Sequence, residues 1–192
     1  MRIALHVCCG ICLKYPLKDL LIKGFIPEGI YYNPNIHPYG EYLNRLETAN
    51  NVMRENSLKL VVPEYNSDIE ASGFFSEIPE SRFEQCRKCY SMRLKYTVFH
   101  AKANGIKRFS TTLLGSPYQN IKLILEIGNE LAAVNGLEFV SFHEEWAKEY
   151  HESKRSLRST GAYLQKYCGC IYSKMDRKLE KCAILAKTRV TI

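Results

Sequence analysis

Residues 3–142 alternate between short apolar runs and longer amphipathic segments, and this alternation constrains the fold more than any other feature of the sequence. Short apolar runs are typical of buried strands, and apolar residues at helical spacing are typical of amphipathic helices. The predicted strands are Ile3–Val7, Phe25–Tyr32, Leu58–Val62, Phe109–Leu114 and Leu137–Phe142. Strands that alternate with helices form βαβ units, so we expect an α/β fold with a five-stranded, mainly parallel sheet flanked by helices.

The segments between the predicted strands carry helix signals. In residues 39–56, for example, Tyr42, Leu46, Ala49 and Met53 recur on one helical face. The predicted helices are Lys14–Ile22, Tyr39–Asn56, Gln85–Asn104 and Gln119–Asn135. From Trp146 onward the alternation is lost, and we expect helices packed against or over the sheet. No repeat or linker divides the chain, so we expect residues 1–192 to form a single domain.

Three cysteines, Cys8, Cys9 and Cys12, follow the first predicted strand and precede the first predicted helix. Open α/β sheets usually bind ligands at the carboxyl ends of their strands. A helix N-terminus also favours thiolate over thiol. A single cysteine here would be interpreted as a small buried hydrophobic residue. Three together favour a metal or redox site.

The chain contains eight cysteines, and the compartment expected for it decides how they are interpreted. No stretch is long and apolar enough to span a membrane, and the N-terminus lacks the apolar core of a signal peptide. We therefore expect a cytoplasmic protein with no membrane partner. Structural disulfides are rare in that compartment, so the cysteines indicate metal, cluster or redox chemistry.

Two further cysteine motifs support this interpretation. The pair Cys86 and Cys89 lies at the start of a predicted helix, where two intervening residues let one turn aim both sulfurs at a metal. A redox dithiol, a zinc half-site and a cluster half-site all fit this spacing. Cys168 and Cys170 are separated only by a glycine, so a disulfide between them would be strained and easily reduced, although both could instead bind a metal. Cys182 lies on an apolar helical face, and we expect it in the core.

Polar loops follow the second and fourth predicted strands, at the edge of the sheet where ligands usually bind. Asn33, Asn35 and His37 lie in a loop stiffened by two prolines, and Thr111 and Ser116 end the fourth strand. Either loop could hold a substrate or could be a rigid turn whose side chains satisfy one another. His6, inside a strand, is more typical of a hydrogen-bonded core histidine than of a metal ligand.

The formal charge of +7 is concentrated at the C-terminal end. Residues 1–147 contain 16 basic and 16 acidic residues, whereas residues 148–192 contain 11 basic and 4 acidic ones. This basic helical tail, which carries the Cys168-Gly169-Cys170 motif, suits a polyanion such as nucleic acid, although a solvated surface explains the charge equally well. The first strand is followed by Cys-Cys-Gly-Ile-Cys and not by a glycine-rich phosphate loop, which argues against nucleotide binding there.

Five motifs, taken in order, resemble those of one enzyme family. They are Cys8-Cys9-x-x-Cys12, Tyr32-Asn33-Pro34-Asn35-Ile36-His37-Pro38, Cys86-x-x-Cys89-Tyr90-x-x-Arg93, Thr111-Thr112-Leu113 with Ser116-Pro117, and Tyr167-Cys168-Gly169-Cys170. The pattern resembles the QueH family of epoxyqueuosine reductases from residue 3 to about residue 173. Two stretches depart from it: Tyr163-Leu164-Gln165 replaces the common Tyr-Arg-Gln, and residues 146–159 differ from the usual lysine- and glycine-containing version.

The resemblance implies a fold similar to the adenine-nucleotide α-hydrolases and a reductase that removes the epoxide oxygen of epoxyqueuosine at the tRNA wobble position. This is the last step of queuosine biosynthesis, and an iron–sulfur cluster supports it. The implied partners are a tRNA with a queuosine-type anticodon and an electron donor that the sequence does not identify.

The resemblance and the spacing together assign roles to particular residues. Cys8, Cys9, Cys86 and Cys89 are the expected ligands of a [4Fe–4S] cluster, and Cys12 could bind an additional iron ion. Cys168 and Cys170 are the expected redox-active catalytic pair. The expected substrate-binding residues are Asn33, Asn35, His37, Tyr90, Arg93, Thr111 and Ser116.

Two alternatives remain open at this point. A cluster-dependent tRNA thiolase would be built on a related sheet, but it normally activates its base with ATP, and the phosphate loop is missing. The other alternative is a tRNA-binding module stabilised by zinc or a cluster, with no enzymatic activity. The colour and metal content of anaerobically purified protein would separate an iron–sulfur protein from a zinc protein.

Overall fold

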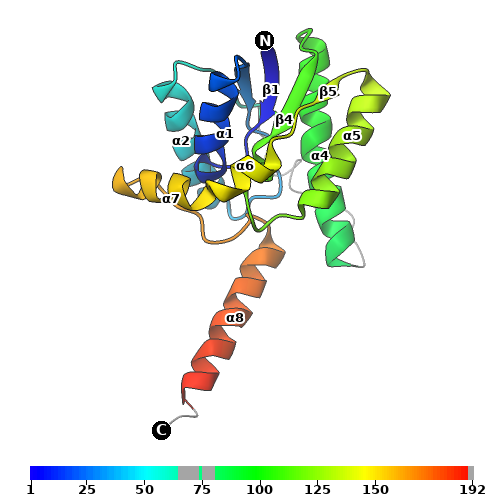
Figure 1. Ribbon diagram of the computed structural model, residues 1–192. Helices are drawn as coiled ribbons and strands as arrows, with labels where there is room; N and C mark the ends of the chain where they lie inside the picture. The colour runs from blue at the N-terminus through cyan, green and yellow to red at the C-terminus, as the bar shows by residue number, and fades with distance from the viewer. Residues whose placement is uncertain (65–73, 75–80, 190–192) are drawn as a thin grey trace.

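The computed structural model describes residues 1–64, 74 and 81–189, and it contains a five-stranded parallel sheet with the strand order β3-β2-β1-β4-β5 (Figure 1). The strands are β1 (Arg2–His6), β2 (Ile26–Ile30), β3 (Leu60–Val61), β4 (Arg108–Thr111) and β5 (Glu138–Phe139). The helices are α1 (Gly10–Ile22), α2 (Tyr39–Glu55), α4 (Arg82–Ala103), α5 (Ile121–Asn135), α6 (His143–Lys148), α7 (Tyr150–Ser159) and α8 (Ile171–Arg189), with a 3₁₀ helix, η1, at Thr112–Gly115. The predicted fold class is confirmed.

The central strand β1 explains why the first apolar run is continuous. It pairs with β2 on one side and β4 on the other, and Ile3 through His6 are fully buried. Ile3 and Leu5 pack in the larger core cluster with α1 and α2, while Ala4 packs with residues of α4 and β4 in a second cluster. A parallel strand covered on both faces has no polar side, so it shows no alternation of polar and apolar residues.

The strand order places the topological switch point at β1. After β1 the chain moves to β2 and β3 on one side, and it returns through α4 to β4 on the other side. In open α/β sheets, ligands usually bind outside the carboxyl ends of the strands at such a switch point. Cys8 and Cys9 leave β1 at this point, and Thr111 and Thr112 leave β4 beside them.

Several bounds differ from the sequence-based predictions, and three differences concern cysteine motifs or the edge of the sheet. The first helix begins at Gly10 and not at Lys14, because Cys9 caps it. The fourth strand ends at Thr111, where the Thr111 hydroxyl accepts the Leu113 N–H and the chain turns into η1. The expectation for Cys182 is wrong: α8 extends away from the body (Figure 1), and Cys182 is exposed.

The helices after β5 pack on the body as expected as far as α7. Trp146 of α6 is fully buried, and its indole Nε1–H donates to Asp19 of α1 at 2.8 Å. Leu157 of α7 is also buried in the larger core cluster. Among the described residues, the helices do not combine the length and apolar character needed to cross a membrane.

Candidate thiol-lined active site

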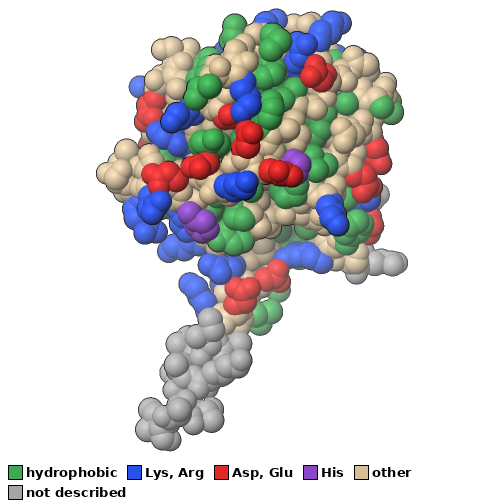
Figure 2. Space-filling model, in the orientation of Figure 1, with side chains coloured by type: hydrophobic (Ala, Val, Ile, Leu, Met, Phe, Trp, Pro, Cys, Tyr) green, Lys and Arg blue, Asp and Glu red, His purple; other side chains and the backbone are tan. Residues whose placement is uncertain are grey.

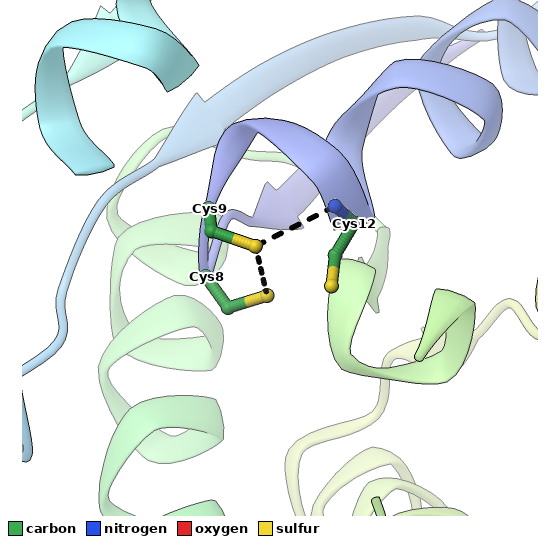
Figure 3. Close-up of side chains that lie close together, drawn as sticks. All are labelled: Cys8, Cys9 and Cys12. Carbon is green, nitrogen blue, oxygen red and sulfur yellow. Dashed lines mark hydrogen bonds between the residues drawn. The ribbon is translucent and has the colours of Figure 1, made fainter. Parts of the chain in front are cut away.

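Cys8, Cys9 and Cys12 form a compact group of buried thiols at the junction of β1 and α1 (Figure 3). Their three sulfurs lie within 4.8 Å of one another, and the sulfurs of Cys8 and Cys9 are 3.7 Å apart. The Cys9 sulfur also caps α1 by accepting the Cys12 backbone N–H at 3.5 Å. One turn of chain therefore brings together three sulfurs with less than 8% exposure each.

The environment makes these three thiols chemically different. The pKa of Cys8 is lowered, because hydrogen bonds from the thiols of Cys12 and Cys9 stabilise its thiolate and outweigh the effect of burial. Burial raises the pKa of Cys9 to about 12, and hydrogen bonding to Cys8 raises the pKa of Cys12. Thr112 adds a hydroxyl that donates to the Cys8 sulfur at 3.3 Å. Of the three thiols, Cys8 is therefore the most acidic.

The second pair of predicted ligands lies in the first turns of α4. Cys86 is partly exposed and Cys89 is buried. Ser81 caps this helix by accepting the Glu84 N–H at 3.2 Å, so the pair lies near a helix N-terminus as predicted. Burial raises the pKa of both thiols, and the nearby charge of Cys168 raises them further. Cys86 and Cys89 thus share an electrostatic environment with the tail motif.

Among the described residues, the group that could hold a single metal ion consists of Cys8, Cys9 and Cys12. It includes Cys12, and it does not include the predicted ligands Cys86 and Cys89. Four thiolates around one zinc ion lie about 3.8 Å apart, because each Zn–S bond is about 2.3 Å long and the geometry is tetrahedral. The sulfurs of Cys8, Cys9 and Cys12, within 4.8 Å of one another, are close to this spacing. The cluster ligand set Cys8, Cys9, Cys86 and Cys89 stays a prediction.

Arg93 links the two halves of the site from one turn beyond Cys89. Its guanidinium is 3% exposed and donates three hydrogen bonds: to Cys89 Sγ at 3.5 Å, to His6 Nε2 at 3.3 Å and to Asn33 Oδ1 at 2.9 Å. Asn33 in turn donates to the Val7 carbonyl at 2.9 Å. His6 is fully buried and hydrogen-bonded, as predicted.

The segment 163–170 folds back over the site and places the Cys168-Gly169-Cys170 motif there. Arg45 of α2 donates to the carbonyls of Tyr167 and Cys168 at 2.9 and 3.0 Å. The His37 N–H donates to the Gly169 carbonyl at 3.0 Å, and Gln165 Nε2 donates to the Cys9 sulfur at 2.6 Å. The tail motif and the first cysteine motif are therefore joined through one docked segment.

Cys168 and Cys170 form a close dithiol at the start of α8. Their sulfurs are 3.5 Å apart, and Cys168 Sγ is 2.9 Å from the Ser173 hydroxyl. Hydrogen bonding to the Cys170 thiol lowers the pKa of Cys168 to about 5, with a further contribution from Ser173. The same interaction raises the pKa of Cys170. At neutral pH the pair is therefore a thiolate beside a thiol, which is the reactive form of a redox dithiol.

The predicted substrate-binding residues lie around this site, mostly as buried groups. Asn33, Thr111 and Arg93 are engaged within the β1, β4 and α4 network, and Ser116 is buried after η1. Tyr90 donates its hydroxyl proton to Gln119 at 2.8 Å. Their contact with a substrate remains a prediction.

Asn35 and His37 belong to the loop against which the tail docks. His37 Nε2 is 3.1 Å from the Pro34 carbonyl, and burial lowers the pKa of this imidazole. Asn35 is 1% exposed, and within the described part of the chain its Oδ1 has no hydrogen-bond partner. A buried acceptor without a donor is costly, so this atom is suited to accept a hydrogen bond from a ligand.

Comparison with known proteins agrees with this geometry. A family model described as epoxyqueuosine reductase QueH matches residues 3–176. The chain belongs to the QueH family. It is 32% identical over 177 residues to the epoxyqueuosine reductase QueH of Dehalococcoides mccartyi, covering 92% of this chain and 94% of that protein. It is also 32% identical over 195 residues to the QueH protein of Thermotoga maritima, covering 97% of each.

A third relative, the QueH protein of Helicobacter pylori, is 33% identical over 180 residues, which cover 88% of this chain and 48% of that longer protein. The resemblance found in the sequence motifs is therefore confirmed at the level of the family.

The sequence did not single out three residues that the structure places in the site. Thr112 binds both the backbone N–H and the sulfur of Cys8, Gln165 binds Cys9, and Arg45 holds the tail motif. Thr112 and Gln165 occur inside the quoted motifs, so their position beside predicted site residues could have identified them. Arg45 lies in the middle of an amphipathic helix and gives no local signal.

Proposed function

We propose that this protein is an epoxyqueuosine reductase, which removes the epoxide oxygen from epoxyqueuosine at the wobble position of tRNA. Its membership of the QueH family supports this function. The observation that carries the proposal is the meeting of buried thiols from the β1 loop with the tail dithiol through the docked segment 163–170. A cytoplasmic location would give this protein both its tRNA substrate and the reducing conditions that keep its cysteines as thiols.

The donor set fits an iron–sulfur cluster held by Cys8, Cys9, Cys86 and Cys89. Thiolates are the usual ligands of such clusters, and these cysteines are provided by the starts of two helices. The burial of three of these thiols also suits a centre that must be protected from water and oxygen. Bound there, a [4Fe–4S] cluster would supply electrons one at a time, and Cys12 would remain available for an additional iron ion.

The tail dithiol can supply the two electrons that deoxygenation consumes. Converting an epoxide to an alkene and water consumes two electrons and two protons. Oxidation of the Cys168 thiolate and the Cys170 thiol to a disulfide releases two electrons and one proton, and solvent supplies the second proton. The 3.5 Å separation of their sulfurs needs only a local movement for the S–S bond to form. The strained ring would then be readily reduced again by an external electron donor.

The substrate would approach from the side on which α8 leaves the body. Figure 2 shows Lys and Arg side chains around this part of the surface, with acidic side chains among them. A tRNA anticodon loop presents unstacked bases and phosphates, which polar loops and basic residues can bind. In this proposal the Oδ1 of Asn35, which has no hydrogen-bond partner among the described residues, accepts a hydrogen bond from the modified base.

Replacement of single cysteines tests the cluster and the activity together. Cys89→Ser and Cys86→Ser should lose most of the iron and sulfide and all epoxide reduction, measured on anaerobically purified protein. Cys182→Ser is the matched control, because Cys182 is exposed on α8 away from the body. Wild-type protein that is colourless and carries stoichiometric zinc would instead support a tRNA-binding module. Full iron content and turnover in Cys89→Ser would reject the ligand assignment.

A further inference from the structure

Arg93 is a buried cation with no acidic partner in the described part of the chain. Its three hydrogen bonds go to a sulfur, an imidazole and an amide oxygen. Among the residues that the structure describes, no carboxylate lies within ion-pair distance of its guanidinium. Burying a charge that is not compensated is strongly unfavourable, so this arrangement requires a negative group close by.

A second buried arginine shows how the same fold compensates a cation by ordinary means. Arg45 is 2% exposed, and its guanidinium lies 2.7 Å from the carboxylate of Glu41, one turn earlier on α2. At Arg93 the corresponding place is taken by the Cys89 sulfur, 3.5 Å away. The contrast indicates that the Cys89 sulfur, as a thiolate bound to the proposed cluster, would provide the compensating charge at Arg93.

The neutral partners of Arg93 fix its direction. Because His6 Nε2 accepts from Arg93, the neutral imidazole carries its proton on Nδ1 and donates it to the Thr111 hydroxyl, 2.8 Å away. Asn33, anchored on the Val7 carbonyl, holds a second guanidinium nitrogen. The remaining nitrogen is thereby directed to Cys89.

Arg93 lies between two of the cysteine motifs. Its guanidinium donates to Cys89 of the second motif at 3.5 Å, and through Asn33 it is joined to the carbonyl of Val7, the residue before Cys8. The buried positive charge is therefore held close to both proposed pairs of cluster ligands.

We propose that Arg93, oriented by His6 and Asn33, is the built-in counter-ion of this site, and that its charge sets the reduction potential of the centre held by the surrounding thiolates. This inference rests on the proposed iron–sulfur function. A fixed positive charge in a low-dielectric interior favours the state that carries the extra electron, so it makes the centre easier to reduce. Arg93 is then a positioning residue, in contrast to the substrate contact that the sequence motif suggested.

The test compares three variants by anaerobic redox titration of the protein with its cluster bound. Arg93→Gln keeps hydrogen-bonding capacity but removes the charge, and Arg93→Lys keeps a charge. Arg87→Gln is the matched control, since Arg87 lies on the same helix beside Cys86 but is partly exposed and paired with Glu126 at 2.6 Å. Arg93→Gln should lower the equilibrium constant for one-electron reduction at least tenfold, which is about 59 mV. Arg93→Lys should recover most of this change, and Arg87→Gln should leave the potential unchanged.

The other outcomes are also decisive. If Arg93→Gln folds without iron and Arg93→Lys restores the iron, charge compensation is supported. If both variants fold without iron, or if Arg93→Gln keeps the wild-type potential and loses only tRNA affinity, the counter-ion role is overturned. A wild-type protein that contains no cluster would refute the proposed cofactor and this inference together. A normal cluster with an unchanged potential in Arg93→Gln would refute this inference alone.

Discussion

Gly169→Ala should detach the tail motif from the site while leaving the body folded. Gly169 has a φ of +119°, a conformation that residues with a side chain rarely adopt. A Cβ placed there would lie 2.9 Å from Ile36 Cγ1, 3.1 Å from an Arg45 nitrogen and 3.3 Å from Asn35 Nδ2. The backbone conformation should cost about 1–3 kcal/mol. The crowding against buried neighbours adds about 1–3 kcal/mol.

The interactions that hold the segment are of similar total strength. Three backbone carbonyls, those of Tyr167, Cys168 and Gly169, accept hydrogen bonds from Arg45 and His37, and Gln165 donates to Cys9. The hydroxyls of Tyr163 and Tyr167 also donate, to the Glu41 carboxylate and the His37 carbonyl. With about 1 kcal/mol for each bond, and with the entropy of ordering the loop subtracted, docking is favourable by no more than a few kcal/mol. The strain is therefore large enough to undock the segment. Once the segment is undocked the strain is released, so the free energy of unfolding falls by no more than the docking free energy.

Gly161→Ala is the matched control in the same tail. Gly161 also has a positive φ, +73°, but a Cβ there would meet nothing within 4 Å. It should cost about 1–2 kcal/mol of backbone strain without disturbing the site. Because Trp146 is the only tryptophan and is fully buried in the body, its fluorescence in urea reports unfolding of the body and not of the loop.

We expect Gly169→Ala to lower kcat/KM for epoxide reduction by about 100-fold or more, corresponding to about 2.7 kcal/mol of docking free energy. The urea transition should persist, with a lower midpoint. Gly161→Ala should keep kcat/KM within about twofold of wild type, because the strain it adds lies away from the reacting groups. Equal behaviour of the two variants in both measurements would refute the packing argument.

Two further predictions concern the tail. The alkylation rate of Cys168 by iodoacetamide, followed by peptide mass spectrometry, should be constant above about pH 6 and should fall below pH 5, because its lowered pKa of about 5 keeps it a thiolate at neutral pH. Cys170→Ala should move this transition to higher pH. A wild-type rate that still rises between pH 7 and 9 would contradict the dithiol assignment. Changing Lys154, Arg155 and Arg158 of α7 to Glu should weaken tRNA binding and leave the iron content unchanged. The slope of the logarithm of the binding constant against the logarithm of the salt concentration should become less steep, by up to about 0.9 for each tRNA phosphate that the variant no longer neutralises. Undiminished affinity would mean that the charge is only a solvated surface.

The sheet and its ligand edge could be predicted from the sequence because both depend on local patterns. A central parallel strand is apolar where both its faces are covered, and Ile3, Ala4 and Leu5 of β1 show this directly. Chain order then places the loops after β1 and β4 at one edge, and with them Cys8 and Thr111. The predicted ends of helices and strands were less accurate where a side chain hydrogen-bonds to the backbone. The sulfur of Cys9 caps α1, which therefore begins before the predicted residue, and the hydroxyl of Thr111 ends β4 before the predicted residue.

The sequence by itself determined the α/β fold, the parallel sheet and the positions of the cysteine motifs, since hydrophobic periodicity and spacing carry that information. Only the tertiary structure decided which groups meet. It placed Cys12 with Cys8 and Cys9, and it docked the tail on Arg45 from α2. It also buried Arg93 against sulfur with no acidic partner within the described chain. Such interactions join residues up to 156 positions apart, and no local pattern encodes them because each partner is chosen by packing and by the cost of burying its charge.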